Sequence, residues 1–125
     1  MNNQELRVIP LASSESDCVI MSHKMRLLEG ETLDGESVED AAQRITSEKL
    51  GLEHMTSVAR LFPVDGVHGY VVEASSGTKT DMRRTFAGRA FALDELLKDY
   101  ENHPERYNQT DIALLDSYNH RTFRI

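Results

Sequence analysis

A capped, one-sided helix over residues 38–50 is the feature that most restricts how this chain can fold. Five residues lie there at helical spacing along one side, and all but the last are apolar: Val38, Ala41, Ala42, Ile45 and Lys49. Ser37 stands at the N-cap position with Asp40 three residues later, and Gly51 follows the last turn. Such a helix gains its stability by packing against another layer, so we expect it at the centre of a layered domain.

Short strand signals surround this helix. On its N-terminal side the sequence predicts a strand over 6–9 that ends at Pro10, and two more over 18–21 and 24–28 with a bend or bulge at Ser22-His23. Residues 29–36 contain two glycines and little periodicity, which indicates a loop.

The C-terminal half alternates strands and helices. Strands are expected over 56–64 and 67–74, joined by a hairpin turn at Asp65-Gly66, and again over 83–91. A helix is expected over 93–100, capped by Asp94 or a neighbour. The last helix, over 110–118, should bury Ile112, Leu115 and either Ala113 or Tyr118. The whole pattern favours a mixed α/β sandwich.

Length and charge limit the classes of function. The 125 residues fit one domain, 1–125, and the single cysteine, Cys18, excludes an internal disulfide framework and a cysteine zinc site. The 14 basic and 21 acidic residues give a net charge of −7, which disfavours general binding to a nucleic-acid backbone. No apolar run is long enough to cross a membrane and the start lacks a signal peptide, so we expect a soluble cytoplasmic protein, with a homodimer left open.

The segment from Gly30 to Leu52 resembles the Nudix box, the signature of hydrolases that act on nucleoside diphosphates linked to another group. The positions in register are Gly30, Glu36, Arg44, Glu48, Gly51 and Leu52, and Gly35 is also similar to the family. The stretch Phe91-Ala-Leu-Asp-Glu-Leu96 is similar to one that often follows the last strands of Nudix domains. The resemblance implies an α/β/α sandwich with a mixed sheet and the box helix at its centre.

The departures from the family pattern fall on its chemistry. Two of the three glutamates that the family carries on the box helix are replaced, by Ile45 and Lys49, and only Glu48 remains. Hard divalent cations take oxygen ligands, and a protonated lysine repels them. We therefore expect Mg²⁺ or Mn²⁺ to bind weakly at best. The candidate ligands are Glu48, the carbonyl of Gly30 and Asp81.

The retained box residues also have structural interpretations. Glu36 and Arg44 are predicted to form an ion pair that fastens the loop to the helix, while Gly30 and Gly35 permit a tight loop. Glu48 is either a surviving metal ligand and catalytic group or a solvated charge paired with Arg44 one turn away.

Three hypotheses for the function follow. The first is a Nudix-like domain with little or no catalysis that binds a nucleotide, another phosphorylated small molecule or a protein partner. The second is a Mg²⁺-dependent hydrolase that uses substitute carboxylates, for which the candidates are Glu29, Glu31, Glu53, Asp65 and Asp81. The third is an accidental resemblance in a small interaction domain. In any of these, Arg83 and Arg84 either contact a phosphate or face solvent.

Overall fold

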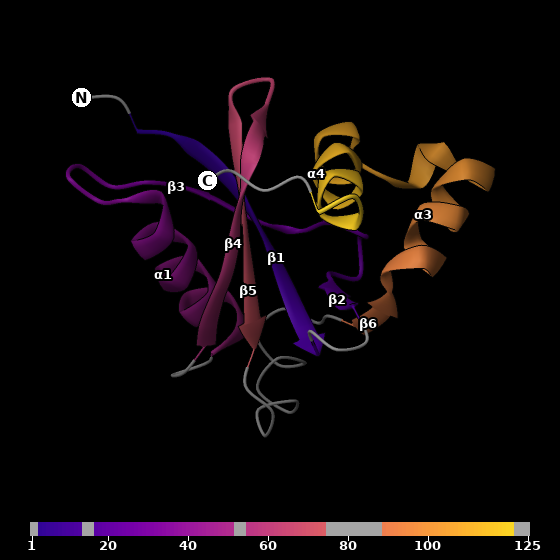
Figure 1. The fold of residues 1–125 in the computed structure, drawn as a ribbon, viewed down its shortest axis with the longest axis horizontal. Coiled ribbons are helices and arrows are strands. Elements are labelled where there is room, and N and C mark those ends of the chain that lie inside the picture. Colours follow the sequence, from indigo (N-terminus) through magenta and orange to yellow (C-terminus); the bar gives the residue numbers. More distant parts are fainter. Residues whose placement is uncertain (1–2, 14–16, 52–54, 75–88, 122–125) are drawn as a thin grey trace.

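A mixed sheet flanked by helices forms the frame of the computed structural model, which describes residues 3–13, 17–51, 55–74 and 89–121 (Figure 1). The strands are β1 (Glu5–Ser13), β2 (Cys18–Met21), β3 (Leu28–Glu31), β4 (Met55–Val64), β5 (Val67–Ala74) and β6 (Arg89–Ala92). The helices are α1 (Val38–Leu50), α3 (Leu93–Asn102) and α4 (Gln109–Asn119), with a short 3₁₀ turn, η1 (Pro104–Arg106).

Strand β1 is the centre of the sheet. The order is β4-β5-β1-β2-β6, and β1 pairs in parallel with β5 and antiparallel with β2. The first half of β1 pairs with β3, ending at Val8 opposite Leu28, and its second half pairs with β2, starting at Leu11 opposite Val19. The expectation that Pro10 ends this strand is therefore wrong. Pro10 falls where β1 changes partner, so its missing N–H interrupts neither antiparallel pairing.

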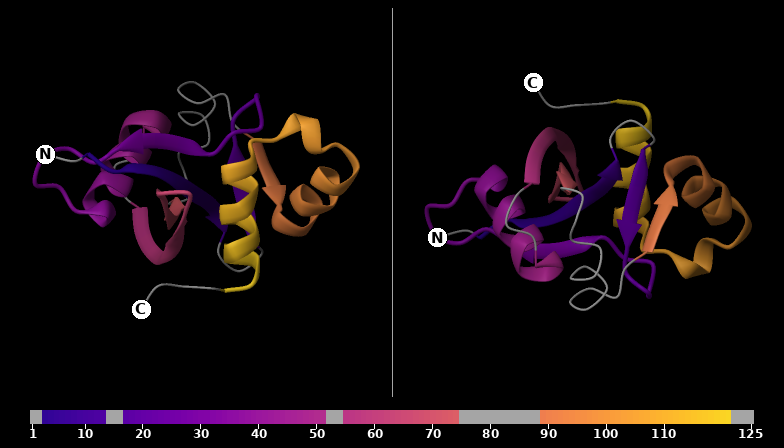
Figure 2. Two further views of the ribbon diagram at one scale, coloured as in Figure 1. Left: turned by 90° about the horizontal axis from the view of Figure 1, so that it is seen from above. Right: turned by 90° about the horizontal axis from the view of Figure 1, so that it is seen from below.

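The two faces of the sheet hold separate apolar cores. Side chains alternate along β1, so that Leu6 and Val8 pack toward α1 while Ile9 and Leu11 pack toward α3 and α4. Figure 2 shows α1 and α3 at opposite ends of the molecule, with α4 between them. This arrangement confirms the predicted α/β/α sandwich with a mixed sheet.

Helix α1 has the predicted bounds and caps. The Ser37 hydroxyl accepts a hydrogen bond from the Asp40 amide at 3.1 Å, and Gly51 closes the helix in the left-handed conformation at φ 68°. The buried face consists of Val38, Ala41, Ala42, Ile45, Thr46 and Leu50. Lys49, which the spacing placed on this side, is exposed.

The segment before α1 differs from the expectation. Residues 24–27 form a turn instead of a strand, because the Ser22 amide donates to the Arg26 carbonyl at 3.0 Å and Met25 adopts a positive φ of 59°. Strand β3 begins only at Leu28 and continues through Gly30 to Glu31, inside the stretch predicted to be a loop. Pairing with β1 makes these residues a strand although their composition does not favour one.

The C-terminal half follows the prediction with small corrections. The β4–β5 hairpin turns at Asp65 and Gly66, both at positive φ. Helix α3 begins after Ala92 without a side-chain cap, so the predicted Asp94 cap is wrong. In α4 Ile112, Leu115 and Tyr118 are buried and Ala113 is only half-buried, while the buried Leu114 was not predicted. No helix in the described ranges is both long and apolar enough to cross a membrane.

Candidate functional site

An ion pair joins the loop before α1 to the helix itself. The Arg44 guanidinium donates from Nε to Glu36 Oε2 at 3.0 Å and from Nη2 to Glu36 Oε1 at 3.1 Å. Arg44 Nη2 also donates to the carbonyl of Glu31 at 2.7 Å, at the end of β3. The predicted contact is therefore present, and it connects β3, the loop and α1.

The same contacts shift the titration of both partners. Hydrogen bonds from Arg44, and then from the Leu33 amide at 2.9 Å, lower the pKa of the Glu36 carboxyl. The Glu36 carboxylate in turn raises the pKa of the Arg44 guanidinium. Glu36 is thus held as an anion by two donors, and its role in the fold is to position the loop.

Ile45 occupies the space beside Gly30. Its side chain is 2% exposed, and a Cβ placed on Gly30 would lie 2.5 Å from Ile45 Cδ1 and 3.0 Å from Ile45 Cγ1. Gly30 lies in β3 opposite Leu6 and does not have a positive φ, so the prediction that it permits a tight loop is wrong. Its missing side chain instead admits Ile45. Gly35 does take a positive φ, 78°, in the loop as predicted.

The other two positions of the helix face solvent. Glu48 is 59% exposed, and its carboxylate lies 3.5 Å from Arg44 Nη1, the i,i+4 pair considered from the sequence. Lys49 is also exposed. In the part of the chain that the structure describes, no three His, Cys, Asp or Glu side chains are placed to hold a metal ion together.

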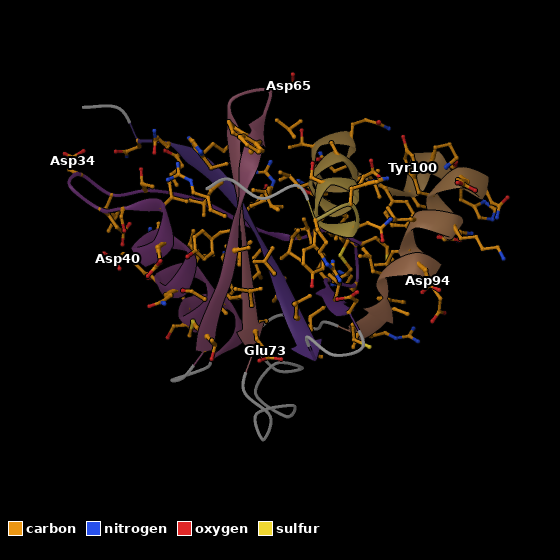
Figure 3. The ribbon with its side chains drawn as sticks, in the orientation of Figure 1. Asp34, Asp40, Asp65, Glu73, Asp94 and Tyr100 are labelled. Carbon is orange, nitrogen blue, oxygen red and sulfur yellow. The ribbon has the colours of Figure 1, made fainter. Side chains whose placement is uncertain are left out.

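The substitute carboxylates lie elsewhere. Glu29 contacts Arg7 and Arg26 on the sheet face that α4 covers. Glu31 lies two residues further along β3 and therefore has its side chain on the same face. Neither carboxylate lies on the α1 side with Glu48. Figure 3 shows Asp65 at the tip of the β4–β5 hairpin, away from α1. The remaining candidates, Glu53 and Asp81, and the candidate phosphate ligands Arg83 and Arg84, lie outside the described residues.

A buried charge cluster on the α4 face was not predicted. Asp111, fully buried in the first turn of α4, lies 3.2 Å from Arg7 Nε and accepts hydrogen bonds from Arg26 Nε at 3.0 Å and the Leu27 amide at 3.1 Å. Arg26 and Leu27 are 85 and 84 residues from Asp111 along the chain. No local sequence pattern could signal these contacts, which fasten α4 to β1 and to the turn before β3.

Comparison with known proteins identifies the fold. No protein-family model and no curated protein matches the chain. Among solved structures, the chain is similar to one from a study of MutT of Aliivibrio salmonicida and Vibrio cholerae, with a TM-score of 0.60, 14% identity, and 93% of this chain and 94% of that chain covered. It is also similar to DR0079 from Deinococcus radiodurans (TM-score 0.68, 17% identity, 98% and 83% covered). A third is a Nudix hydrolase from Nitrosomonas europaea (TM-score 0.64, 12% identity, 98% and 92% covered).

These similarities extend over nearly the whole chain at low identity, and they show that the chain has the Nudix fold. They confirm the fold that the box resemblance implied. They do not carry over an activity, because a fold can be kept while its site changes.

Proposed function

We propose that this Nudix-fold chain has an eroded metal site and acts by binding a nucleotide-type ligand, with weak hydrolysis or none. The observation that carries the proposal is the side chain of Ile45, which fills the space beside Gly30 with methyl and methylene groups. A carboxylate at this helix position would bring oxygen ligands to β3, whereas a buried isoleucine excludes both water and a cation from it.

The donor set beside α1 does not fit a divalent cation. Glu48 offers one carboxylate, and Arg44 already pairs with it at 3.5 Å. The neighbouring Lys49 adds a positive charge to the same exposed surface. Magnesium sites on proteins use one or two carboxylates together with substrate phosphates and water, and a guanidinium and an ammonium at the site oppose the cation.

The same positive groups favour an anionic ligand. Lys49 is exposed, so its ammonium group can contact a phosphate. The Glu36–Arg44 ion pair holds the loop before α1 against the helix that carries Lys49. A phosphorylated small molecule can therefore be held beside α1 by side-chain charge without a metal. The alternative occupant of the same surface is a protein partner.

The test is a hydrolysis screen combined with thermal shift. Nucleoside triphosphates, sugar nucleotides, dinucleoside polyphosphates and capped RNA are each incubated with the protein and Mg²⁺ or Mn²⁺, and the melting temperature is recorded with and without metal. The proposal predicts metal-independent stabilisation by at least one phosphorylated compound, and little or no product formation, the same in Glu48→Gln as in the parent. Metal-dependent turnover that Glu48→Gln abolishes would contradict it and establish a hydrolase.

A further inference from the structure

A cavity of about 570 Å³ lies at the end of the molecule away from α1. It is formed by β6, α3 and η1, with Met25 contributed by the turn before β3. Its volume lies within the range of small-molecule sites, roughly 300–1,000 Å³. Two of its lining residues, Phe91 and Leu96, begin and end the Nudix-like stretch of the sequence, which the site beside α1 does not use.

The inner wall of the cavity is apolar and firmly held. Leu96 is 1% exposed and Tyr107 is 8% exposed, and the half-buried Phe91 lies beside them in the lining. The Tyr107 hydroxyl donates to Asp99 at 2.6 Å, and its ring meets Tyr100 edge-on at a centroid distance of 6.0 Å. Figure 3 shows Tyr100 where α3 and α4 approach each other. The half-buried ring of Phe91, backed by these buried residues, is therefore the part of the wall on which a flat group can lie.

Three cations stand around this wall in a chain whose net charge is −7: Arg89, Lys98 and Arg106. The Arg89 guanidinium lies over the Phe91 ring, 5.4 Å from its centroid. Within the described ranges, neither Arg89 nor Lys98 forms an ion pair. Both are exposed, so their charges are available to a ligand.

Two acids also line the cavity. Asp99 accepts the Tyr107 hydroxyl and lies 3.6 Å from Arg106, so its charge is already compensated. Glu95 is exposed at the first turn of α3. With the Arg106–Asp99 pair set aside, the lining has two cations, Arg89 and Lys98, against one acid, Glu95.

We propose that the cavity between β6, α3 and η1 binds a small aromatic phosphate, with its ring against Phe91 and Arg89 and its phosphate on Arg89 and Lys98. A planar ring gains from stacking on an aromatic side chain and on a guanidinium. A phosphate dianion gains charge-assisted hydrogen bonds from the same two side chains. The site is separate from the surface beside α1, and its ligand binds without a metal.

The test compares four probes by calorimetry without divalent metal: adenosine monophosphate, phenyl phosphate, adenosine and inorganic phosphate. At least one of the two aromatic phosphates should bind at least about tenfold more tightly than either adenosine or inorganic phosphate. Which of the two binds better tells whether the natural ligand is a nucleotide or a simpler aryl phosphate. Failure of both aromatic phosphates to bind, or equal binding by inorganic phosphate, would overturn the proposal.

Four variants locate the site. Arg89→Gln and Lys98→Gln remove cations from the cavity at exposed positions, and each should weaken the binding about tenfold. Lys24→Gln removes an exposed cation that does not line the cavity, and it should leave the affinity unchanged. Lys49→Gln removes the cation that the proposed function places beside α1, and it tests that surface as the alternative site. The reverse pattern, with binding lost in Lys49→Gln and kept in both cavity variants, would place the ligand beside α1. That result overturns the cavity site while supporting ligand binding at the box helix.

Discussion

The contact between Gly30 and Ile45 can be tested by adding one methyl group. In Gly30→Ala the new Cβ would lie 2.5 Å from Ile45 Cδ1 and 3.0 Å from Ile45 Cγ1, closer than unbonded carbon atoms approach. Gly30 has no positive φ, so the backbone itself accepts alanine. The cost is therefore overpacking alone, and we expect a loss of about 1–3 kcal/mol in the free energy of unfolding.

A second substitution shows whether Ile45 is the cause. Ile45→Val removes Cδ1, the nearest atom, and should cost about 0.5–1.5 kcal/mol by itself. In the double variant the alanine methyl enters the space that Cδ1 leaves. The combined loss should then fall short of the sum of the single losses by at least about 0.5 kcal/mol, which is the coupling expected of residues in contact.

Urea denaturation of the parent, both single variants and the double variant measures this coupling. Ile20→Val is the matched control, because it makes the same chemical change in the same apolar cluster, where Ile20 is 3% exposed. Combined with Gly30→Ala, it should be additive within roughly 0.3–0.5 kcal/mol. Additivity of the Gly30 and Ile45 changes would refute the conclusion that Ile45 fills the space beside Gly30.

Three further predictions concern charge. Asp111→Asn should lower the free energy of unfolding by about 1.5–3 kcal/mol, because it removes the buried carboxylate that faces Arg7 and Arg26 while both arginines keep Glu29 as a partner, and an unchanged urea midpoint would contradict this. Hydrogen bonds from Arg44 lower the pKa of Glu36 in the folded state, so its stabilising effect is present above the unfolded value near 4.5 and is lost as pH falls through the lowered pKa. The difference in the free energy of unfolding between the parent and Glu36→Gln should accordingly become smaller as the pH is lowered. A difference that grows would contradict the lowered pKa of Glu36. Without metal, the double variant Ile45→Glu, Lys49→Glu should have a lower melting temperature than the parent, because like charges one turn apart repel. Mn²⁺ should raise the melting temperature of the variant more than that of the parent. Equal rises would show that this helix face cannot form a metal site.

Local signals explain where the sequence analysis succeeded. The bounds of α1 follow from Ser37 and Gly51, whose capping roles depend only on neighbouring residues. The β4–β5 turn was equally clear, because Asp65 and Gly66 tolerate positive φ. The ion pair of the box could be predicted because the family spacing supplied the two partners.

Tertiary context explains the failures. Strand β3 contains Gly30 between two glutamates, a composition that favours a loop, and pairing with β1 determines its conformation. The spacing placed Ile45 and Lys49 on the same side of α1, yet Ile45 is buried and Lys49 is exposed. The cluster around Asp111 joins distant parts of the chain, so it became visible only with the structure.

Metal affinity tests the central claim, that the box helix no longer forms a cation site, most directly. Isothermal titration of the parent protein with Mn²⁺, beside the Glu48→Gln variant, gives the affinity and identifies the ligand in one experiment. With Ile45 buried and Glu48 paired to Arg44, we predict binding no tighter than about millimolar, the same in both proteins. Micromolar affinity in the parent that Glu48→Gln abolishes would contradict the claim.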